Sequence, residues 1–99
     1  MNKCKVTVLR RNTTEGIFDK YSEDKDEKCP IFKEGQEFII DDPAKMPDDF
    51  CAYAWSDISR DTVALMCGAD YPWIKQANTA IVCCTDGLKP VIFKLEMTK

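Results

Sequence analysis

The sequence contains no histidine among its 99 residues. A Ser-His-Asp triad, a Cys-His nucleophile pair and an imidazole general base are therefore excluded. A zinc finger with mixed cysteine and histidine ligands is excluded for the same reason. No other set of residues supplies an acid, a base and a substrate pocket together, so the sequence leaves open whether the chain is an enzyme.

Long hydrophobic runs are also missing. The longest uninterrupted apolar run, residues 50–55, has six residues, whereas a membrane-spanning helix needs about 20. Near the amino terminus, the segment 6–9 between Lys5 and Arg10 is too short for the apolar core of a signal peptide. We therefore expect no membrane association and a cytoplasmic location, where thiols stay reduced unless they bind metal or cycle catalytically.

The chain has no surplus of basic residues. Its 14 Lys and Arg face 17 Asp and Glu, which gives a formal net charge of -3. A nucleic-acid-binding domain normally carries a basic surplus, so we expect no nucleic-acid partner. The four glycines do not form a loop that could cradle a phosphate, and a nucleotide site is not expected.

The residues that are present suit one compact domain. A hydrophobic content of 44% in 99 residues is enough for a single core, so residues 1–99 are expected to form one domain. The highly charged segment 22–28 contains no apolar residue and predicts a solvated loop. Alternating apolar residues predict strands over residues 5–10, 37–41, 80–84 and 91–96.

A stripe of apolar residues with a period of 3.6 predicts one long helix over residues 49–67. Asp48 or Asp49 is the expected N-cap, and Gly68 is expected at the left-handed position after the last turn. The sequence therefore predicts the α+β class. The expected fold is a ββαββ domain in which one helix packs on a roughly four-stranded, mainly antiparallel sheet.

The six cysteines are the most informative residues in the chain. Cys29 precedes a proline where a loop meets the core, and Cys51 lies near the start of the predicted helix, where unpaired amides and the dipole favour a thiolate. Cys83 and Cys84 are adjacent at a strand end, so regular geometry points them to opposite faces. Cys4 is expected to face the core, and Cys67 lies off the helical stripe.

Three interpretations of these cysteines stay open. In the first, an all-thiolate set binds an iron–sulfur cluster or zinc, although the C-x-x-C pair typical of such sites is missing. In the second, the thiols are small buried hydrophobes of a structural or interaction domain, in a homo-oligomer that uses an exposed sheet edge. In the third, the adjacent pair and Cys51 form a thiol redox element. The candidate metal ligands are Cys29, Cys51, Cys83 and Cys84.

The whole chain resembles a family of small uncharacterised cysteine-rich bacterial and archaeal proteins. The residues that carry the likeness are Cys29-Pro30-Ile31-Phe32 with Gly35 and Phe38, Cys51-Ala52-Tyr53-Ala54-Trp55 with Asp57-Ile58, Pro72-Trp73, and the block from Cys83-Cys84-Thr85-Asp86-Gly87 to Phe93. The resemblance implies that the four candidate cysteines belong to the family pattern and that Cys67 does not. The family is commonest in anaerobes, which suits an oxygen-sensitive thiol or cluster, but the resemblance implies no particular activity.

Overall fold

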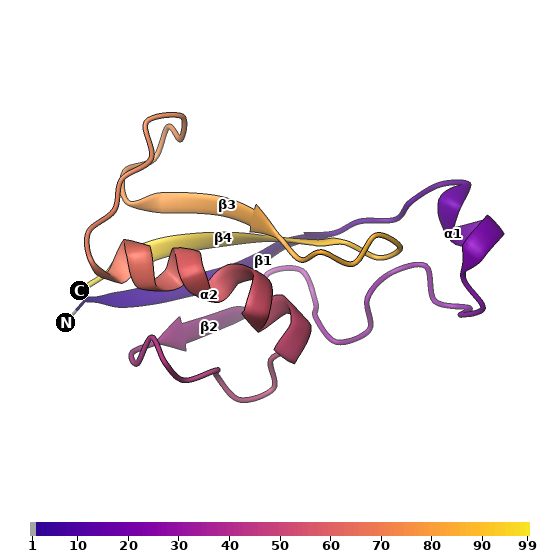
Figure 1. The fold of residues 1–99 in the computed structure, drawn as a ribbon, viewed down its shortest axis with the longest axis horizontal. Coiled ribbons are helices and arrows are strands. Elements are labelled where there is room, and N and C mark those ends of the chain that lie inside the picture. Colours follow the sequence, from indigo (N-terminus) through magenta and orange to yellow (C-terminus); the bar gives the residue numbers. More distant parts are fainter. Residues whose placement is uncertain (1) are drawn as a thin grey trace.

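The computed structural model of the chain describes residues 2–99. It confirms the α+β class and the predicted ββαββ order, with one additional short helix after the first strand (Figure 1). The elements are β1 (Lys3–Arg11), α1 (Ile17–Tyr21), β2 (Glu37–Ile40), α2 (Ala52–Met66), β3 (Thr79–Cys83) and β4 (Val91–Thr98). Neither helix within residues 2–99 is both long enough and apolar enough to cross a membrane.

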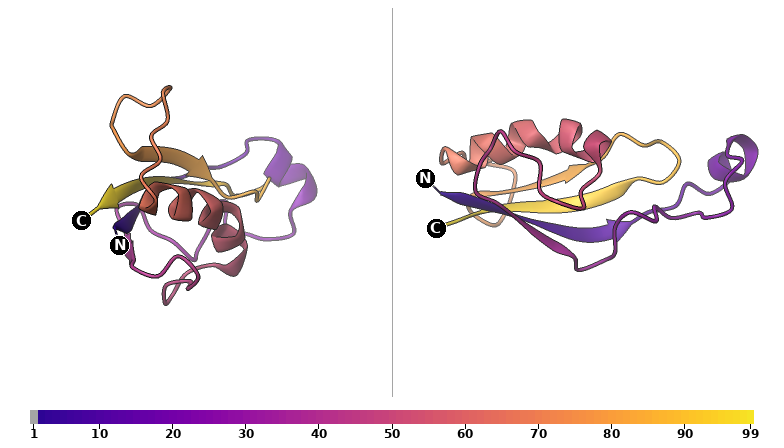
Figure 2. Two further views of the ribbon diagram at one scale, coloured as in Figure 1. Left: turned by 60° about the vertical axis from the view of Figure 1, so that its left-hand side comes forward. Right: turned by 90° about the horizontal axis from the view of Figure 1, so that it is seen from below.

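The four strands form one antiparallel sheet in the order β2-β1-β4-β3. The two longest strands, β1 and β4, lie in the middle, and Val6 of β1 is opposite both Phe38 of β2 and Leu95 of β4. Helix α2 lies across one face of this sheet, and α1 lies at the far end of a long extension from it (Figure 2).

The core lies between α2 and the sheet because alternate strand residues point toward the helix. Strand β1 buries Cys4, Val6 and Val8, and β4 buries Val91, Phe93 and Leu95. Helix α2 contributes Ala54, Ile58 and Leu65. Four phenylalanine rings close one end of this core. Phe32 lies edge-on to Phe38, Phe50 and Phe93, with ring centroids 5.0–6.0 Å apart. This aromatic cluster fixes the segment that follows Cys29 against the sheet.

Helix α2 begins later than the sequence pattern predicts. Its N-cap is Cys51, not Asp48 or Asp49. Asp49 takes a left-handed conformation with a φ of 61°, and the next residue, Phe50, is buried in the aromatic cluster. Because Phe50 is buried in the core in a non-helical segment, the first helical turn begins only after it.

The predicted end of α2 is confirmed. Gly68 has a φ of 94°, and its N–H donates to the carbonyl of Leu65 at 2.9 Å. The N–H of Ala69 donates to the carbonyl of Ala64 at 3.0 Å. These two bonds form a Schellman motif, which requires the left-handed residue that glycine adopts without strain.

Candidate functional site

A pocket of about 390 Å³ lies where the start of α2, the loop after α1 and the turn between β3 and β4 meet. Its wall contains three of the four predicted ligand cysteines: Cys29, Cys51 and Cys84. These residues come from three segments that are far apart in the sequence. The remaining wall is largely apolar and includes the exposed side chains of Ile31 and Tyr53 at its rim.

Cys84 is held at the pocket by the strand pairing that continues past the end of β3. Its backbone N–H donates to the carbonyl of Val91 at 3.1 Å. In return, the N–H of Val91 donates to Sγ of Cys84 at 3.3 Å. An amide donor directed at sulfur favours negative charge on that atom and is one of the contacts that tune thiolate centres.

Cys51 is held at the pocket as the N-cap of α2. Its carbonyl accepts the N–H of Trp55 at 2.9 Å, while its side chain makes no capping hydrogen bond. The first turn of α2 contains no acidic residue, so no carboxylate there offsets the positive end of the helix dipole. The N-cap position thus places Cys51 on the wall of the pocket at the start of α2.

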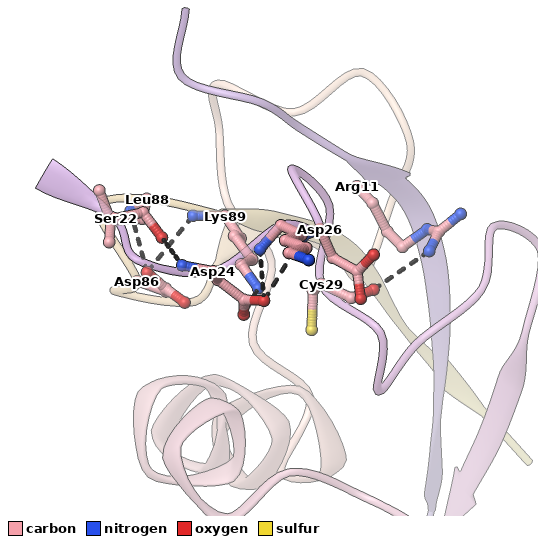
Figure 3. Close-up of polar contacts among 9 residues, drawn as sticks. Arg11, Ser22, Asp24, Asp26, Cys29, Asp86, Leu88 and Lys89 are labelled. Atoms are coloured by element: carbon pink, nitrogen blue, oxygen red, sulfur yellow. Dashed lines mark hydrogen bonds and ion pairs between the residues drawn. The ribbon is translucent and has the colours of Figure 1, made fainter. Parts of the chain in front are cut away.

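Cys29 belongs to the loop between α1 and β2, and Arg11 at the end of β1 holds that loop. Nη1 of Arg11 donates to the carbonyl of Cys29 at 3.1 Å. Nε and the backbone N–H of Arg11 donate to the two carboxylate oxygens of Glu34 at 2.9 and 3.0 Å. The sulfur of Cys29 points away from Arg11 and toward the coil of α2 (Figure 3).

The other three cysteines lie outside this pocket. Cys83 is exposed, and its Sγ donates to the carbonyl of Cys84 at 3.1 Å. Partial desolvation raises the pKa of Cys83, and the nearby Cys84 and Asp57 raise it further. Cys4 is fully buried, as expected, and desolvation raises its pKa to about 11. Cys67 is exposed at the end of α2.

The three pocket thiols lie around a common space without meeting. Within residues 2–99, no group of three or more cysteine or acidic side chains lies close enough together to hold a metal ion. The three cysteines therefore line one pocket, but their thiols are separated from one another. A ligand that bonds to all three requires the surrounding segments to close on it.

Two polar residues of the site were not singled out by the sequence. Asp57 of α2 accepts the N–H of Thr85 at 2.8 Å and its hydroxyl at 3.0 Å. This contact holds the segment after Cys84 against the helix. Lys89 is 9% exposed, lines the pocket, and pairs with Asp24 of the charged loop. The hydrogen bond between them raises the pKa of Lys89 and lowers the pKa of Asp24.

The contact between Arg11 and Glu34 predicts a pH-dependent contribution to stability. The N–H of Glu34 itself, then the N–H of Arg11, and finally the guanidinium lower the pKa of Glu34 from 4.5 to about 2. A lowered folded-state pKa stabilises the protein above pH 4.5, and this stabilisation is lost as the pH falls toward 2. Wild type is therefore expected to be more stable than Glu34→Gln near neutral pH and to lose that advantage in acid. Urea unfolding of both proteins from pH 7 to pH 2 measures this difference, and a constant difference would contradict the prediction.

No protein-family model matches the chain, and no curated protein or solved structure matches it either.

Proposed function

We propose that the chain binds a soft metal centre, zinc or an iron–sulfur cluster, through the thiolates of Cys29, Cys51 and Cys84. The observation that carries the proposal is that a loop, a helix N-cap and a strand end each place one cysteine on the same pocket. Thiolates are the ligands that soft metal ions and clusters prefer. Cys83 lies outside the proposed set because its thiol donates to a backbone carbonyl and its pKa is raised.

The pocket leaves room for further ligands of the centre besides the three thiolates. A single water molecule has a share of about 30 Å³ in the liquid, and the pocket holds about 390 Å³. Three protein thiolates leave a further coordination position open on a tetrahedral ion. The remaining volume accommodates an external ligand of the metal or the inorganic sulfide of a cluster.

Binding requires the pocket to contract, and the loop that carries Cys29 is the segment that can move. Cys51 is fixed by α2, and Cys84 is fixed by its pairing with Val91. Cys29 lies in the long connection between α1 and β2, before the anchored Phe32, and Arg11 holds this part through one exposed and one part-buried polar contact. Metal sites are rarely preformed in the absence of the metal, and the free energy of binding drives their closure.

The test is purification without oxygen, followed by metal analysis, a visible spectrum and titration with Co²⁺. We expect either a stoichiometric metal or a sulfur-to-metal charge-transfer band on Co²⁺ addition. Serine at position 29, 51 or 84 is expected to lower the affinity by more than about 100-fold, since even outer contacts of a metal site are worth 10- to 100-fold. Cys67→Ser and Cys83→Ser are the matched controls and should bind as wild type does.

Three outcomes would contradict the proposal. A colourless, metal-free protein that gives no band with Co²⁺ would exclude a thiolate metal centre. Equal losses in all five serine variants would place the metal outside the pocket. A metal-free protein in which one thiol reacts much faster than the others with an alkylating reagent would favour a redox role instead.

A further inference from the structure

We propose that the chain forms a homodimer in which each copy inserts Trp73 into the pocket of the other. Trp73 lies on the loop of residues 67–78, which connects α2 to β3 and projects from the body of the molecule (Figure 1). The inference goes beyond the proposed function and does not rest on it. It depends only on the exposed indole and on the size, lining and charge of the pocket.

Trp73 is an exposed aromatic residue that the loop holds in place. It is 74% exposed, and its ring stacks on that of Tyr71, with the centroids 5.1 Å apart. Tyr71 packs against the core, and its hydroxyl donates to Asp61 of α2 at 3.0 Å. The N–H of Ile74 donates to the carbonyl of Tyr71 at 3.1 Å and closes the turn that carries the indole. A large aromatic side chain presented in this way is typical of the residues that anchor protein interfaces.

The base of the loop is braced as well. The backbone N–H of Asn78 donates to Oδ1 of Asp70 at 2.9 Å, and its side-chain amide donates to the carbonyl of Ala69 at 3.0 Å. The side-chain amide of Gln76 donates to Glu96 of β4 at 2.9 Å. These contacts tie the two ends of the loop to each other and to the sheet. Little further ordering is therefore needed when the indole binds a partner, which favours association.

The position of the loop requires that the partner be another molecule. The loop follows the end of α2, whereas the pocket lies at the start of that helix. The 15 residues of α2 span about 22 Å at about 1.5 Å per residue, so Trp73 does not reach the pocket of its own chain. A small molecule on the projecting indole would be enclosed on one side only, whereas small-molecule sites are concave. A pocket on a second protein encloses the ring.

The pocket has the size and lining that suit an indole. Its volume of about 390 Å³ falls within the range of about 300–1,000 Å³ that is usual for sites that enclose drug-sized molecules. Apolar side chains and thiols, both of which pack against aromatic rings, line it: Cys29, Ile31, Cys51, Tyr53 and Cys84 among them. Ile31 and Tyr53 are exposed in the single chain. Insertion of the indole removes these two side chains and Trp73 from water together, which is the main source of favourable free energy.

The charges of the two surfaces favour the same pairing. Asp57 and Asp86 line the pocket, and the lysine on its wall, Lys89, is already paired with Asp24. The loop presents Lys75, an exposed side chain two residues after the indole. Within residues 2–99, Lys75 forms no ion pair. Its ammonium complements the carboxylates of the pocket in a second copy, and such complementarity fixes the orientation of an interface. Reciprocal insertion gives a two-fold dimer, the commonest symmetry of homo-oligomers, and fills both pockets.

Sedimentation of reduced, chelator-treated protein over a range of concentrations tests the inference. Wild type is expected to dimerise as its concentration rises. Trp73→Ala should weaken the dimer by about 30-fold or more, the usual loss on removing an interface hot spot. Ile31→Lys should weaken it comparably, because it places a like charge near Lys75 at the rim of the pocket. Tyr21→Ala is the matched control, since it removes an aromatic side chain that is 69% exposed and lies outside the loop and the pocket.

A mixture of two variants separates insertion from any contact between like surfaces. Trp73→Ala keeps its pocket and Ile31→Lys keeps its loop, so their mixture is expected to dimerise more tightly than either variant alone. Fluorescence reports the same event: Trp55→Phe leaves Trp73 as the sole tryptophan, and its emission should shift to the blue and resist quenching as the dimer forms.

Three results would overturn the inference. They are a wild-type chain that stays monomeric at high concentration, a dimer that Trp73→Ala leaves unchanged, and a mixture that associates no more tightly than its two components. None of these results bears on Co²⁺ binding, which tests the proposed function separately.

Discussion

Replacing Phe32 by alanine is expected to lower the free energy of unfolding by about 3–5 kcal/mol, the usual cost of removing a large aromatic side chain from a core. Phe32 is 1% exposed although it lies in a loop. Its ring contacts three other phenylalanines edge-on, so alanine leaves a cavity at the centre of the aromatic cluster. Urea unfolding followed by circular dichroism measures the change.

The adjacent residue provides the control for this prediction. Ile31 has the same backbone environment but is 51% exposed, so Ile31→Ala is expected to cost less than about 1 kcal/mol. Equal losses in the two variants would mean that Phe32 does not anchor the loop. Since Phe32 lies three residues after Cys29, the alanine variant should also bind metal more weakly at a temperature where it is still folded.

Most of the fold could be predicted because its determinants are local. The alternation of Val6 and Val8, or of Phe93 and Leu95, marks a strand without reference to any other part of the chain. Gly68 likewise marked the end of α2 by itself. The predicted start of α2 was wrong because an aspartate caps a helix only where the residues directly after it are helical, and here the helix starts at Ala52. The burial of Phe50 is a tertiary effect that the local sequence does not show.

The site was predictable in part, for a similar reason. The sequence showed that Cys83 and Cys84 point to opposite faces, but it did not show which of them faces the pocket. Val82 packs against the core while Ile81 is exposed, and both are apolar, so the pattern of the strand does not reveal its inner face. Pairing with β4 determines which face of β3 is turned toward the core, and it places Cys84 on the pocket side.

Lys89 could not have been found from the sequence. A lysine in a turn is usually solvated, and nothing near it in the chain indicates burial. Its partner, Asp24, lies 65 positions away in a segment that reads only as a charged loop. The contact exists because α1 and the turn before β4 lie together at one end of the molecule, where Thr14 donates to the carbonyl of Leu88 at 2.8 Å.

Loading the pocket with metal is expected to raise the melting temperature by about 15–30 °C. A ligand present at 1,000 times its dissociation constant stabilises the folded state by about 4.1 kcal/mol. In a domain of this size, each kcal/mol shifts the midpoint by about 4–8 °C. Thermal unfolding without oxygen, with and without saturating Co²⁺, measures the shift. The chelator-treated protein should return to the lower midpoint.

Cys51→Ser separates loss of binding from loss of folding in this experiment. Serine is among the best N-cap residues because its hydroxyl accepts an amide of the first turn, and the side chain of Cys51 makes no such bond. Metal-free Cys51→Ser is therefore expected to be as stable as wild type, or more stable by about 0.5–1 kcal/mol, while its midpoint no longer responds to metal. A variant that still gains the full shift would show that the metal binds elsewhere. The expected result would mean that cysteine at position 51 makes the helix less stable than serine would. A cysteine with a purely structural role does not explain this cost, whereas a metal-binding thiolate does.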